Sequence, residues 1–189
     1  MDSDKKIIRC TWCGTDPLYV KYHDEEWGKP VYDDQTLFEF LILESAQAGL
    51  SWITVLRKRE NYRKAFANFN AQKVAEFSEV DLERLMKDEG IIRNRLKISS
   101  TIKNAKLFLE IQKEYGSFSN YIWGFLPDKK PIINFWPDHK SMPAQTELSN
   151  RISSDMKNRG FKFFGSTICY AHMQATGMIN DHIEGCIAR

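Results

Sequence analysis

The chain contains no long hydrophobic run. No segment approaches the roughly 20 consecutive apolar residues that a helix needs to cross a lipid bilayer. Residues 1–9 also lack the apolar centre of a secretory signal peptide. We therefore expect a soluble, cytoplasmic protein that does not bind membranes.

Cysteine and net charge are low as well. Four cysteines in 189 residues do not indicate a disulfide scaffold, so reduced-thiol or metal-binding roles come first. The formal net charge is only +2. Any affinity for a polyanion must therefore come from local clusters of basic residues.

Strand-like alternation, internal repeats and low-complexity segments are also missing from the sequence. Hydrophobic residues make up 42% of the chain and aromatic residues 13%, which is enough to close one sizeable core. The sequence therefore predicts an all-α protein with a single domain over residues 1–189.

The most informative stretch is the apolar segment that begins at residue 37. Six of the seven residues from 37 to 43 are apolar, a pattern typical of a helix surrounded by protein. Asp33 or Asp34 can N-cap this helix. Glu44 follows Leu37 by seven residues and Leu41 by three, so it shares their face and is expected to lie out of bulk water.

The end of this helix is predicted to form a tight corner. Gly49 can serve as its C-cap, and Leu50 then stands at the turn as an apolar tip. Ser51 can N-cap a second helix that opens with Trp52. A buried acid, an apolar tip and a tryptophan therefore converge on one turn.

Helical periodicity and capping residues predict the remaining elements. Ser78-x-x-Asp81 resembles a capping box ahead of a short helix that ends near Lys87. We expect further helices over residues 52–66, 94–115, 118–125, 148–159 and 165–176, and loops over residues 9–24 and 127–143.

A short hairpin that contains Gly90 joins the two helices on either side of it, giving a helix-hairpin-helix over about residues 80–106. The hairpin N–H groups lead into a helix N-terminus with basic side chains alongside, which is a natural seat for a phosphate. No acid stands between these basic residues, so we expect a strongly electropositive surface here. They are Arg93, Arg95, Lys97, Lys103 and Lys106.

Potential metal ligands lie near both ends of the chain. Cys10-x-x-Cys13 is compatible with a redox pair or with half of a zinc site, and His23 is the nearest other ligand. The residues alone leave open whether Cys10 or Cys13 binds the metal, and which later pair completes the site. The two candidate pairs are His182 with Cys186, which share one face at helical spacing, and Cys169 with His172.

Seven blocks of sequence stand out along the chain. They are Cys10-x-Trp12, Asp16-Pro17-Leu18-Tyr19-x-x-Tyr22-His23-Asp24-x-x-Trp27-Gly28, Leu43-Glu44-x-x-Gln47-Ala48-Gly49-Leu50-Ser51-Trp52, Lys58-Arg59-Glu60-Asn61-Tyr62-Arg63, Gly90-Ile91-Ile92-Arg93, Arg159-Gly160-Phe161-Lys162-Phe163 and Asn180-Asp181-His182-x-x-x-Cys186. Together they resemble the 3-methyladenine DNA glycosylase I family of bacteria over nearly the whole chain. The resemblance implies an all-α fold of the helix-hairpin-helix DNA glycosylase superfamily. It also implies a monomeric, monofunctional enzyme that hydrolyses the N-glycosidic bond of 3-methyladenine in double-stranded DNA and leaves an abasic site.

The residue types fit that chemistry. An adenine methylated at N3 is cationic in DNA, so its glycosidic bond is already weakened and the base leaves as a neutral molecule. The enzyme must supply a pocket for a flipped, electron-poor purine. Indole faces attract a cationic ring, and a carboxylate accepts a hydrogen bond from the exocyclic amine while favouring positive charge. The residues of these types are Trp12, Tyr19, Tyr22, Glu44 and Trp52.

The resemblance also implies individual roles. Glu44 and Tyr22 are the expected catalytic residues, and they share the base pocket with Trp12 and Trp52. From the residues themselves, Leu50 beside Gly49 is a candidate wedge that enters the base stack, the alternative being an apolar residue buried at a helix corner. The phosphate seat of the hairpin predicts DNA contacts at Gly90, Ile92, Arg93 and Arg95.

For the metal, the resemblance points to one structural zinc ion. Four ligands leave no open coordination position, which is typical of a structural rather than a catalytic zinc site. The expected ligands are Cys10, His23, His182 and Cys186.

One feature of the wider superfamily is not evident. Many members place an aspartate downstream of the hairpin, often after Gly-Pro, and a lysine marks the lyase enzymes. Pro127-Asp128 and Pro137-Asp138 are the only Pro-Asp pairs, and both are interpreted as turn residues in a loop. The absence agrees with a monofunctional enzyme that acts on a labile, charged lesion.

Three other functions are compatible with the sequence to different degrees. The chain is also compatible with a glycosylase for another damaged base, or with a non-catalytic DNA-binding module in which Glu44 is structural. A thiol oxidoreductase that uses Cys10 and Cys13 is less favoured, because no thioredoxin-like βαβ pattern surrounds them.

Overall fold

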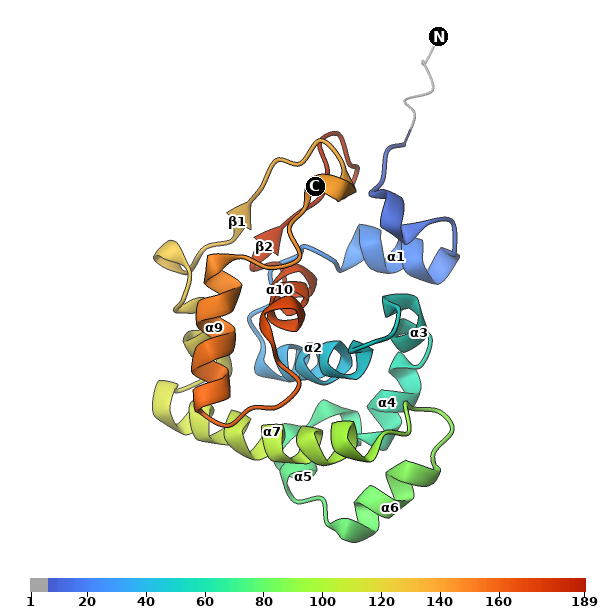
Figure 1. The fold of residues 1–189 in the computed structure, drawn as a ribbon, viewed down its shortest axis with the longest axis vertical. Coiled ribbons are helices and arrows are strands. Elements are labelled where there is room, and N and C mark those ends of the chain that lie inside the picture. The colour runs from blue at the N-terminus through green and yellow to red at the C-terminus, as the bar shows by residue number, and fades with distance from the viewer. Residues whose placement is uncertain (1–6) are drawn as a thin grey trace.

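Helix α2 (Asp34–Gln47) runs through the middle of the molecule, in a computed structural model that describes residues 7–189 (Figure 1). All residues from Leu37 to Ala46 are buried, as expected for a helix enclosed by protein. The Asp33 carboxylate accepts a hydrogen bond from the Thr36 N–H at 2.8 Å. The predicted central helix and its N-cap are therefore confirmed.

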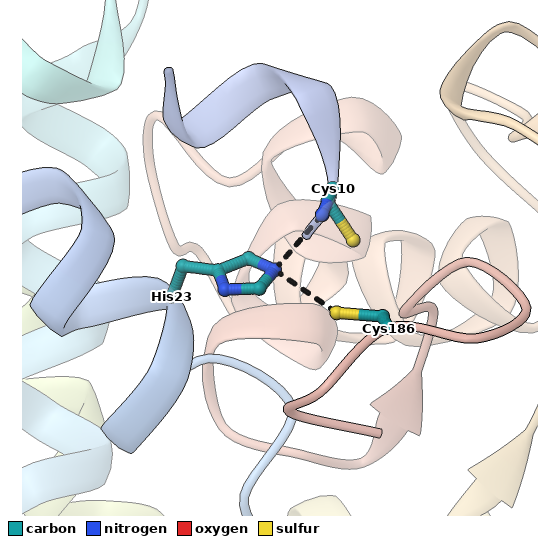
Figure 2. Close-up of side chains that lie close together, drawn as sticks. All are labelled: Cys10, His23 and Cys186. Atoms are coloured by element: carbon teal, nitrogen blue, oxygen red, sulfur yellow. Dashed lines mark hydrogen bonds between the residues drawn. The ribbon is translucent and has the colours of Figure 1, made fainter. Parts of the chain in front are cut away.

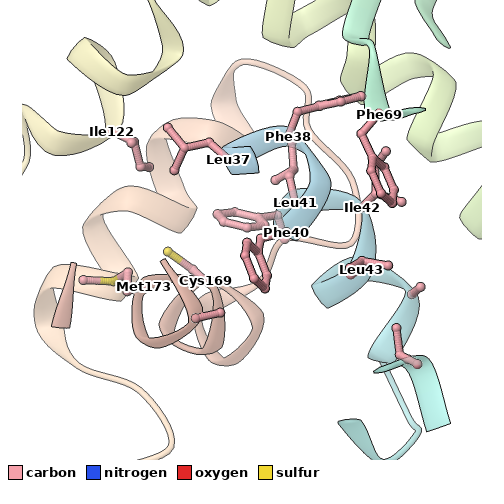
Figure 3. Close-up of a cluster of buried hydrophobic side chains, with 14 of the residues drawn as sticks. Leu37, Phe38, Phe40, Leu41, Ile42, Leu43, Phe69, Ile122, Cys169 and Met173 are labelled. Atoms are coloured by element: carbon pink, nitrogen blue, oxygen red, sulfur yellow. The ribbon is translucent and has the colours of Figure 1, made fainter. Parts of the chain in front are cut away.

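The side chains of α2 form the centre of the hydrophobic core (Figure 3). Leu37 and Phe40 lie among residues of α8 (Phe118–Trp123) and α10 (Ser166–Ala175), while Phe38 packs against Phe108 of α7 (Arg95–Tyr115) at 4.9 Å between ring centroids. Side chains from distant parts of the sequence therefore close around one helix, which holds α2 in place.

The remaining helices surround α2, and the chain is mostly helical, as predicted (Figure 1). Two short strands, β1 (Ile132–Ile133) and β2 (Ile179–Asn180), pair in parallel. No helix within residues 7–189 has both the length and the apolar character that a membrane span requires. The remaining helices are α1 (Pro17–Glu25), α3 (Trp52–Leu56), α4 (Arg59–Ala65), α5 (Ala71–Ala75), α6 (Glu79–Lys87) and α9 (Glu147–Asn158).

Helix α1 lies where a loop was predicted. The Asp16 carboxylate accepts hydrogen bonds from the Leu18 N–H at 2.9 Å and the Tyr19 N–H at 3.3 Å, and Pro17 occupies the first helical position. Both are helix-start signals. The prediction was wrong because the segment has no continuous apolar stripe, so its periodicity is weak.

The segment 52–66 forms two helices instead of the predicted one. Helix α3 ends at Leu56, and the Lys58 N–H donates to the Val55 oxygen at 2.9 Å, the tighter i to i−3 pattern that often ends a helix. Helix α4 then begins at Arg59. The apolar residues continue with helical spacing across this break, so the pattern does not reveal it.

The C-terminal tail is not helical, so the prediction that His182 and Cys186 share a helix face was wrong. After β2, Ile183 forms a bridge with Trp136, and the Glu184 N–H donates to the Trp136 oxygen at 2.9 Å. The loop predicted over residues 127–143 is therefore paired with the tail. Strands of two residues are too short to produce the alternation that sequence analysis detects.

Helices α6 and α7 and the connection between them follow the prediction closely. The Ser78 N–H donates to Asp81 at 2.9 Å in a capping box, and Asn94 caps α7 by accepting from the Lys97 N–H at 3.1 Å. Gly116 ends α7 with a left-handed φ of 81°, a conformation that glycine adopts without strain.

The predicted electropositive surface at the start of α7 is partly neutralised. Arg95 forms ion pairs with Glu79 and Glu83 of α6, and Arg93 lies 3.4 Å from Glu89. The sequence has no acid between the basic residues, but the fold brings acids beside them from the preceding helix and the connection. The expectation of strong, unopposed positive charge was therefore wrong.

Candidate active site

A cavity of about 230 Å³ is bordered by α1, α2, α3 and α10. All five residues that the sequence proposes for a base pocket line it. The side chains that line the cavity are Trp12, Tyr19, Tyr22, Trp27, Glu44, Gln47, Trp52, His139, Ala171 and Gln174.

Aromatic rings form most of the cavity wall. The ring centroids of Trp12 and Tyr19 are 5.0 Å apart, and those of Trp12 and Trp27 are 4.9 Å apart. Tyr22 lies 5.3 Å from Trp52 on another side. The rings contact one another at tilted or edge-on angles, an arrangement favourable for aromatic pairs that also fixes their faces in position.

Glu44 is the carboxylate of this cavity. Its side chain belongs to a residue that is only 3% exposed, and its Oε2 atom has no hydrogen-bond partner within the protein. Among residues 7–189 it takes part in no ion pair. Burial raises the pKa of Glu44 to about 8. A buried polar group without a partner is uncommon in folded proteins, and here it indicates a place for a ligand.

Two indole N–H groups of the cavity wall are also without partners. Trp12 Nε1 and Trp52 Nε1 are both buried and donate to no group of the described chain. Three orphaned polar atoms, including Glu44 Oε2, therefore belong to side chains of one aromatic cavity.

The two tyrosines of the cavity remain neutral at physiological pH. Burial, followed by the proximity of Glu44, raises the pKa of Tyr22 well above its usual value. Burial also raises the pKa of Tyr19 to about 12. Both phenols therefore keep their protons, so each can donate a hydrogen bond but neither serves as a general base.

An ion pair joins two walls of the cavity. The Arg57 guanidinium, just after α3, lies 2.7 Å from the Asp16 carboxylate, which caps α1. Helix α1 carries Tyr19 and Tyr22, and α3 begins with Trp52. The pair therefore connects the helices that present opposing aromatic rings.

Five cavity residues were not singled out from the sequence. Trp27 lies in a block that carries the family resemblance, and Gln47 follows Glu44 by three residues on the same helix face. Both residues could therefore have been predicted from the sequence. Ala171 and Gln174 have a helical spacing that is common to any core helix. His139 comes from a loop, and nothing in the local sequence predicts its location.

The corner after α2 has the predicted turn, but two of its predicted caps differ. The C-cap position is Ala48, one residue before Gly49, and the Ser51 hydroxyl lies 2.7 Å from the Thr54 hydroxyl and caps no backbone N–H. Gly49 adopts a left-handed φ of 80°, and the Leu50 side chain is 41% exposed. The ammonium group of Lys97 donates to the carbonyl oxygens of Ala46 at 2.9 Å and Ala48 at 2.7 Å. Lys97 therefore satisfies the carbonyl end of α2 and holds the corner against the start of α7.

The hairpin amides proposed as a phosphate seat already have acceptors. The Gly90 N–H donates to the Asp88 carboxylate at 2.8 Å, and the Ile92 N–H donates to the Tyr62 hydroxyl at 3.1 Å. Contacts of Gly90, Ile92, Arg93 and Arg95 with DNA remain a prediction.

Three of the four expected metal ligands lie together (Figure 2). The potential ligand atoms of Cys10, His23 and Cys186 all lie within 4.8 Å of one another, and all three residues are buried. His23 Nε2 is 3.5 Å from Cys186 Sγ. The two ends of the described chain therefore meet at one Cys/His cluster.

The fourth expected ligand, His182, lies beside this cluster but outside the set of mutually close ligand atoms. Its ring centroid is 4.9 Å from that of His23, and its Nε2 atom is 3.4 Å from the His23 oxygen. Gly28 lies against its ring, since a Cβ atom at Gly28 would be 2.9 Å from His182 Cε1. The left-handed φ of Gly28, 77°, favours glycine there as well.

Both histidines are oriented by an acceptor at Nδ1. His23 Nδ1 lies 2.7 Å from the Asp24 carboxylate, which also pairs with Arg9, and His182 Nδ1 lies 2.9 Å from the Asn180 side-chain oxygen. Such partners fix the imidazole tautomer so that Nε2 carries the lone pair a metal needs; in this structure His23 Nε2 accepts a hydrogen bond from the Cys10 N–H at 3.3 Å (Figure 2).

The alternative ligands lie elsewhere. Cys13 Sγ donates to the Cys10 oxygen at 3.1 Å, and burial raises the pKa of its thiol. A reactive Cys-x-x-Cys thiol requires a lowered pKa, so this environment does not favour a thiol oxidoreductase. Cys169 and His172 are buried on α10, where His172 Nε2 lies 3.3 Å from the Leu37 oxygen.

Comparison with known proteins gives a consistent result. The family model described as methyladenine glycosylase matches residues 12–189. The DNA-3-methyladenine glycosylase of Haemophilus influenzae is 48% identical over 178 residues, covering 94% of this chain and 96% of that protein.

Solved structures agree with this match. A crystal structure of 3-methyladenine DNA glycosylase I superimposes with a TM-score of 0.93 at 47% identity, covering 96% of this chain and 100% of the other. The enzyme of the same name from Staphylococcus aureus, from a structural study of 3-methyladenine recognition, gives a TM-score of 0.92 at 36% identity, covering 95% of both chains.

Proposed function

The chain belongs to the methyladenine glycosylase family, and on that basis we propose that its aromatic cavity binds and excises 3-methyladenine. The protein is a DNA repair glycosylase that hydrolyses the N-glycosidic bond of this base. The observation that carries the assignment to the cavity is the buried Glu44 carboxyl, which has an orphaned oxygen and lies among tryptophan and tyrosine rings.

Glu44 favours a positively charged base over a neutral one. With a pKa of about 8, its carboxyl is mostly protonated at neutral pH while the cavity contains no cation. A cationic purine placed against it lowers that pKa and stabilises the carboxylate. Normal adenine brings no charge, so it gives Glu44 no such partner. The pocket therefore selects for the charge of the lesion.

The aromatic side chains supply the rest of the base site. The indole rings of Trp12 and Trp52 attract the cationic ring through their faces, and their free N–H groups are available as donors. Tyr22 stays protonated beside Glu44, and its hydroxyl is the proposed donor that positions the bound base. Tyr19 and Trp27 complete the enclosure.

The reaction that follows is hydrolysis. The C1′–N9 electron pair moves onto the cationic purine and neutralises it, water forms a new bond to C1′, and the water proton passes to solvent. None of the described residues that line the cavity is a lysine, which supports a monofunctional enzyme over a lyase. The products are the free base and an abasic site.

Double-stranded DNA approaches the cavity from the side of the α2–α3 corner. Leu50 is exposed there and is the proposed wedge that replaces the everted base, with Gly49 allowing the sharp turn. The hairpin before α7 is the proposed backbone contact, through Gly90, Ile92, Arg93 and Arg95. Arg95 must exchange its glutamates for phosphate groups on binding. We place this activity in the bacterial cytoplasm, where the DNA substrate lies.

The Cys/His cluster fits a structural zinc ion. Its donor atoms are two thiols and an imidazole whose Nδ1 is held by a carboxylate, with a second imidazole alongside. We assign Cys10, His23, His182 and Cys186 as the ligands. Bound zinc would cross-link the two ends of the chain and leave no coordination position for catalysis.

Removal of one zinc ligand tests this assignment. His182→Ala is expected to reduce the zinc content of the purified protein and to lower its melting temperature, while the folded fraction still releases 3-methyladenine. Cys13→Ala is the matched control, because Cys13 is a nearby thiol outside the cluster, and it should retain zinc. Full zinc content and unchanged melting temperature in His182→Ala would contradict the assignment.

The function itself is tested by identifying the product. Incubation with methylated duplex DNA is expected to release free 3-methyladenine and to leave abasic sites. Release of a different methylated base as the main product would indicate another lesion specificity. Binding to methylated DNA without any base release would favour the non-catalytic module.

A further inference from the structure

A second cavity, of about 290 Å³, adjoins the base pocket. Three of its lining residues, His139, Ala171 and Gln174, also line the base pocket. The two cavities therefore meet along these side chains, and Ala171 is the smallest of them. The residues that line only the second cavity are Met142, Pro143, Ala144, Thr167 and Tyr170.

The floor of the second cavity is one face of helix α10. Thr167, Tyr170, Ala171 and Gln174 follow the i, i+3, i+4, i+7 spacing of a single helix face. Gln174 Nε2 donates to Asp181 at 2.7 Å, and the Tyr170 hydroxyl donates to the same carboxylate. These bonds anchor the floor, which runs from the second cavity into the base pocket.

The other side of the cavity is formed by the segment 139–144. Its first turn, His139–Ser141, is capped by Asp138, which accepts from the Ser141 N–H and hydroxyl at 2.9 Å each. The residues that follow, Met142 to Ala144, present mainly apolar surface to the cavity.

The second cavity differs from the base pocket in charge. The base pocket contains Glu44, whereas none of the described residues that line the second cavity is an aspartate or a glutamate. A cationic purine therefore meets an unpaired carboxyl only in the base pocket, because the Asp181 carboxylate behind the second cavity already accepts hydrogen bonds from Tyr170 and Gln174. A neutral purine, being flat and largely apolar on its faces, suits the second cavity.

Excision creates a neutral purine of this kind. Glu44, against which the base is proposed to bind, is only 3% exposed, and in the proposed complex the abasic strand lies over the α2–α3 corner by which the nucleotide entered. We propose that the second cavity is a binding site for the released purine, by which it leaves while abasic DNA remains bound. This inference rests on the proposed function, because it requires base release in the cavity of Glu44.

The experiment blocks the second cavity without altering the base pocket. Ala144 is exposed and lines only the second cavity, so Ala144→Phe fills that space. The tryptophans of the base pocket report bound base through their fluorescence. The dissociation rate of free 3-methyladenine is measured by rapid dilution, with and without saturating duplex that contains a stable abasic-site analogue.

With abasic duplex bound, Ala144→Phe is expected to release the base about tenfold more slowly than the unaltered protein, the range in which altered contacts change dissociation rates. Without DNA, the two rates should agree, because the base can also leave through the open pocket. Gln145→Phe is the matched control: it adds the same ring at the next exposed position, outside the lining of either cavity, and should behave as the unaltered protein.

Equal dissociation rates for Ala144→Phe and the unaltered protein on abasic duplex would overturn the proposal. A loss of DNA affinity in Ala144→Phe, with base release unchanged, would also overturn it by making the cavity part of the DNA interface. If the unaltered protein does not bind the free base even without DNA, the base pocket itself is wrongly assigned, and this failure is distinct from the other two.

Discussion

Helix α2 carries two buried glutamates with opposite surroundings. Glu39 is 4% exposed and Glu44 is 3% exposed, so burial does not distinguish them. Glu39 accepts hydrogen bonds from the guanidinium groups of Arg59 at 2.6 Å and Arg63 at 2.9 Å. Glu44 faces the aromatic cavity, and one of its oxygens has no partner.

This difference in hydrogen-bond partners shows that Glu39 stabilises the fold and that Glu44 is available to bind a ligand. Five residues separate the two, which turns their side chains about 140° apart around the helix. One side meets α4, where two arginines compensate the charge, and the other meets the cavity. Paired burial makes a structural element, whereas unpaired burial leaves a binding site for a cation.

The largest expected effect follows from breaking the paired side. Glu39→Gln removes the buried carboxylate that Arg59 and Arg63 share, leaving Arg59 with Glu26 and Arg63 with Glu60, and breaking such a buried pair costs about 3 kcal/mol. The free energy of unfolding, measured by urea denaturation, should fall by that amount. Glu44→Gln is the comparison and should be at least as stable as the unaltered protein. An unchanged free energy of unfolding in Glu39→Gln would contradict the structural role assigned to Glu39.

The second effect follows from altering the unpaired side. Glu44→Gln keeps the shape and an acceptor oxygen but cannot become anionic beside a cationic base. The single-turnover rate of 3-methyladenine release should fall about 100-fold, equivalent to about 2.7 kcal/mol of transition-state stabilisation. Glu39→Gln, assayed at a temperature where it is folded, should retain its rate. Equal losses in the two variants would mean that the rate reports general damage to α2.

Sequence analysis predicted the helix that carries these two residues but not the ion pairs that distinguish them. The apolar pattern around residues 37–43 predicts that both lie in a buried helix, and the capping residues predict where that helix begins. The partners of Glu39 come from another helix, 20 and 24 residues away. Periodicity carries no information on such pairing. The family resemblance singled out Glu44, but the ion pairs of Glu39 are visible only in the structure.

The same limit explains the other differences between expectation and structure. Caps and long amphipathic helices are set by neighbouring residues; the cap at Asp33, the Ser78 capping box and a long helix beginning near Asn94 were predicted correctly. The pairing of Arg95 with acids of α6 and the placement of His139 at the cavity depend on contacts between separate elements. The base-pocket residues were found because their chemistry and the family resemblance supplied what local patterns do not.

The smallest expected effect is on the pH dependence of stability. The pKa of Glu44 is about 8 in the folded protein, above its usual value of 4.5. The folded state therefore binds the Glu44 proton more tightly than the unfolded state does. The stability that this proton contributes is fully present below about pH 4.5 and is lost as the pH rises to about 8. Relative to Glu44→Gln, the unaltered protein should lose about 1 kcal/mol of stability between pH 7 and pH 8.

Urea denaturation of both proteins over this pH range checks the prediction. Groups other than Glu44 are common to both, so their titration cancels in the difference. A difference in unfolding free energy that stays constant with pH would show that Glu44 titrates normally.

The most direct test of the account is a titration of the Glu44 carboxyl carbon by carbon-13 NMR, with the signal assigned by its absence in Glu44→Gln. We predict a pKa of about 8 in the free protein and a lower pKa when a cationic methylated purine saturates the pocket. A pKa near the usual value of 4.5 in the free protein, unchanged by the purine, would contradict the claim that Glu44 is an unpaired buried acid that responds to the charge of the lesion.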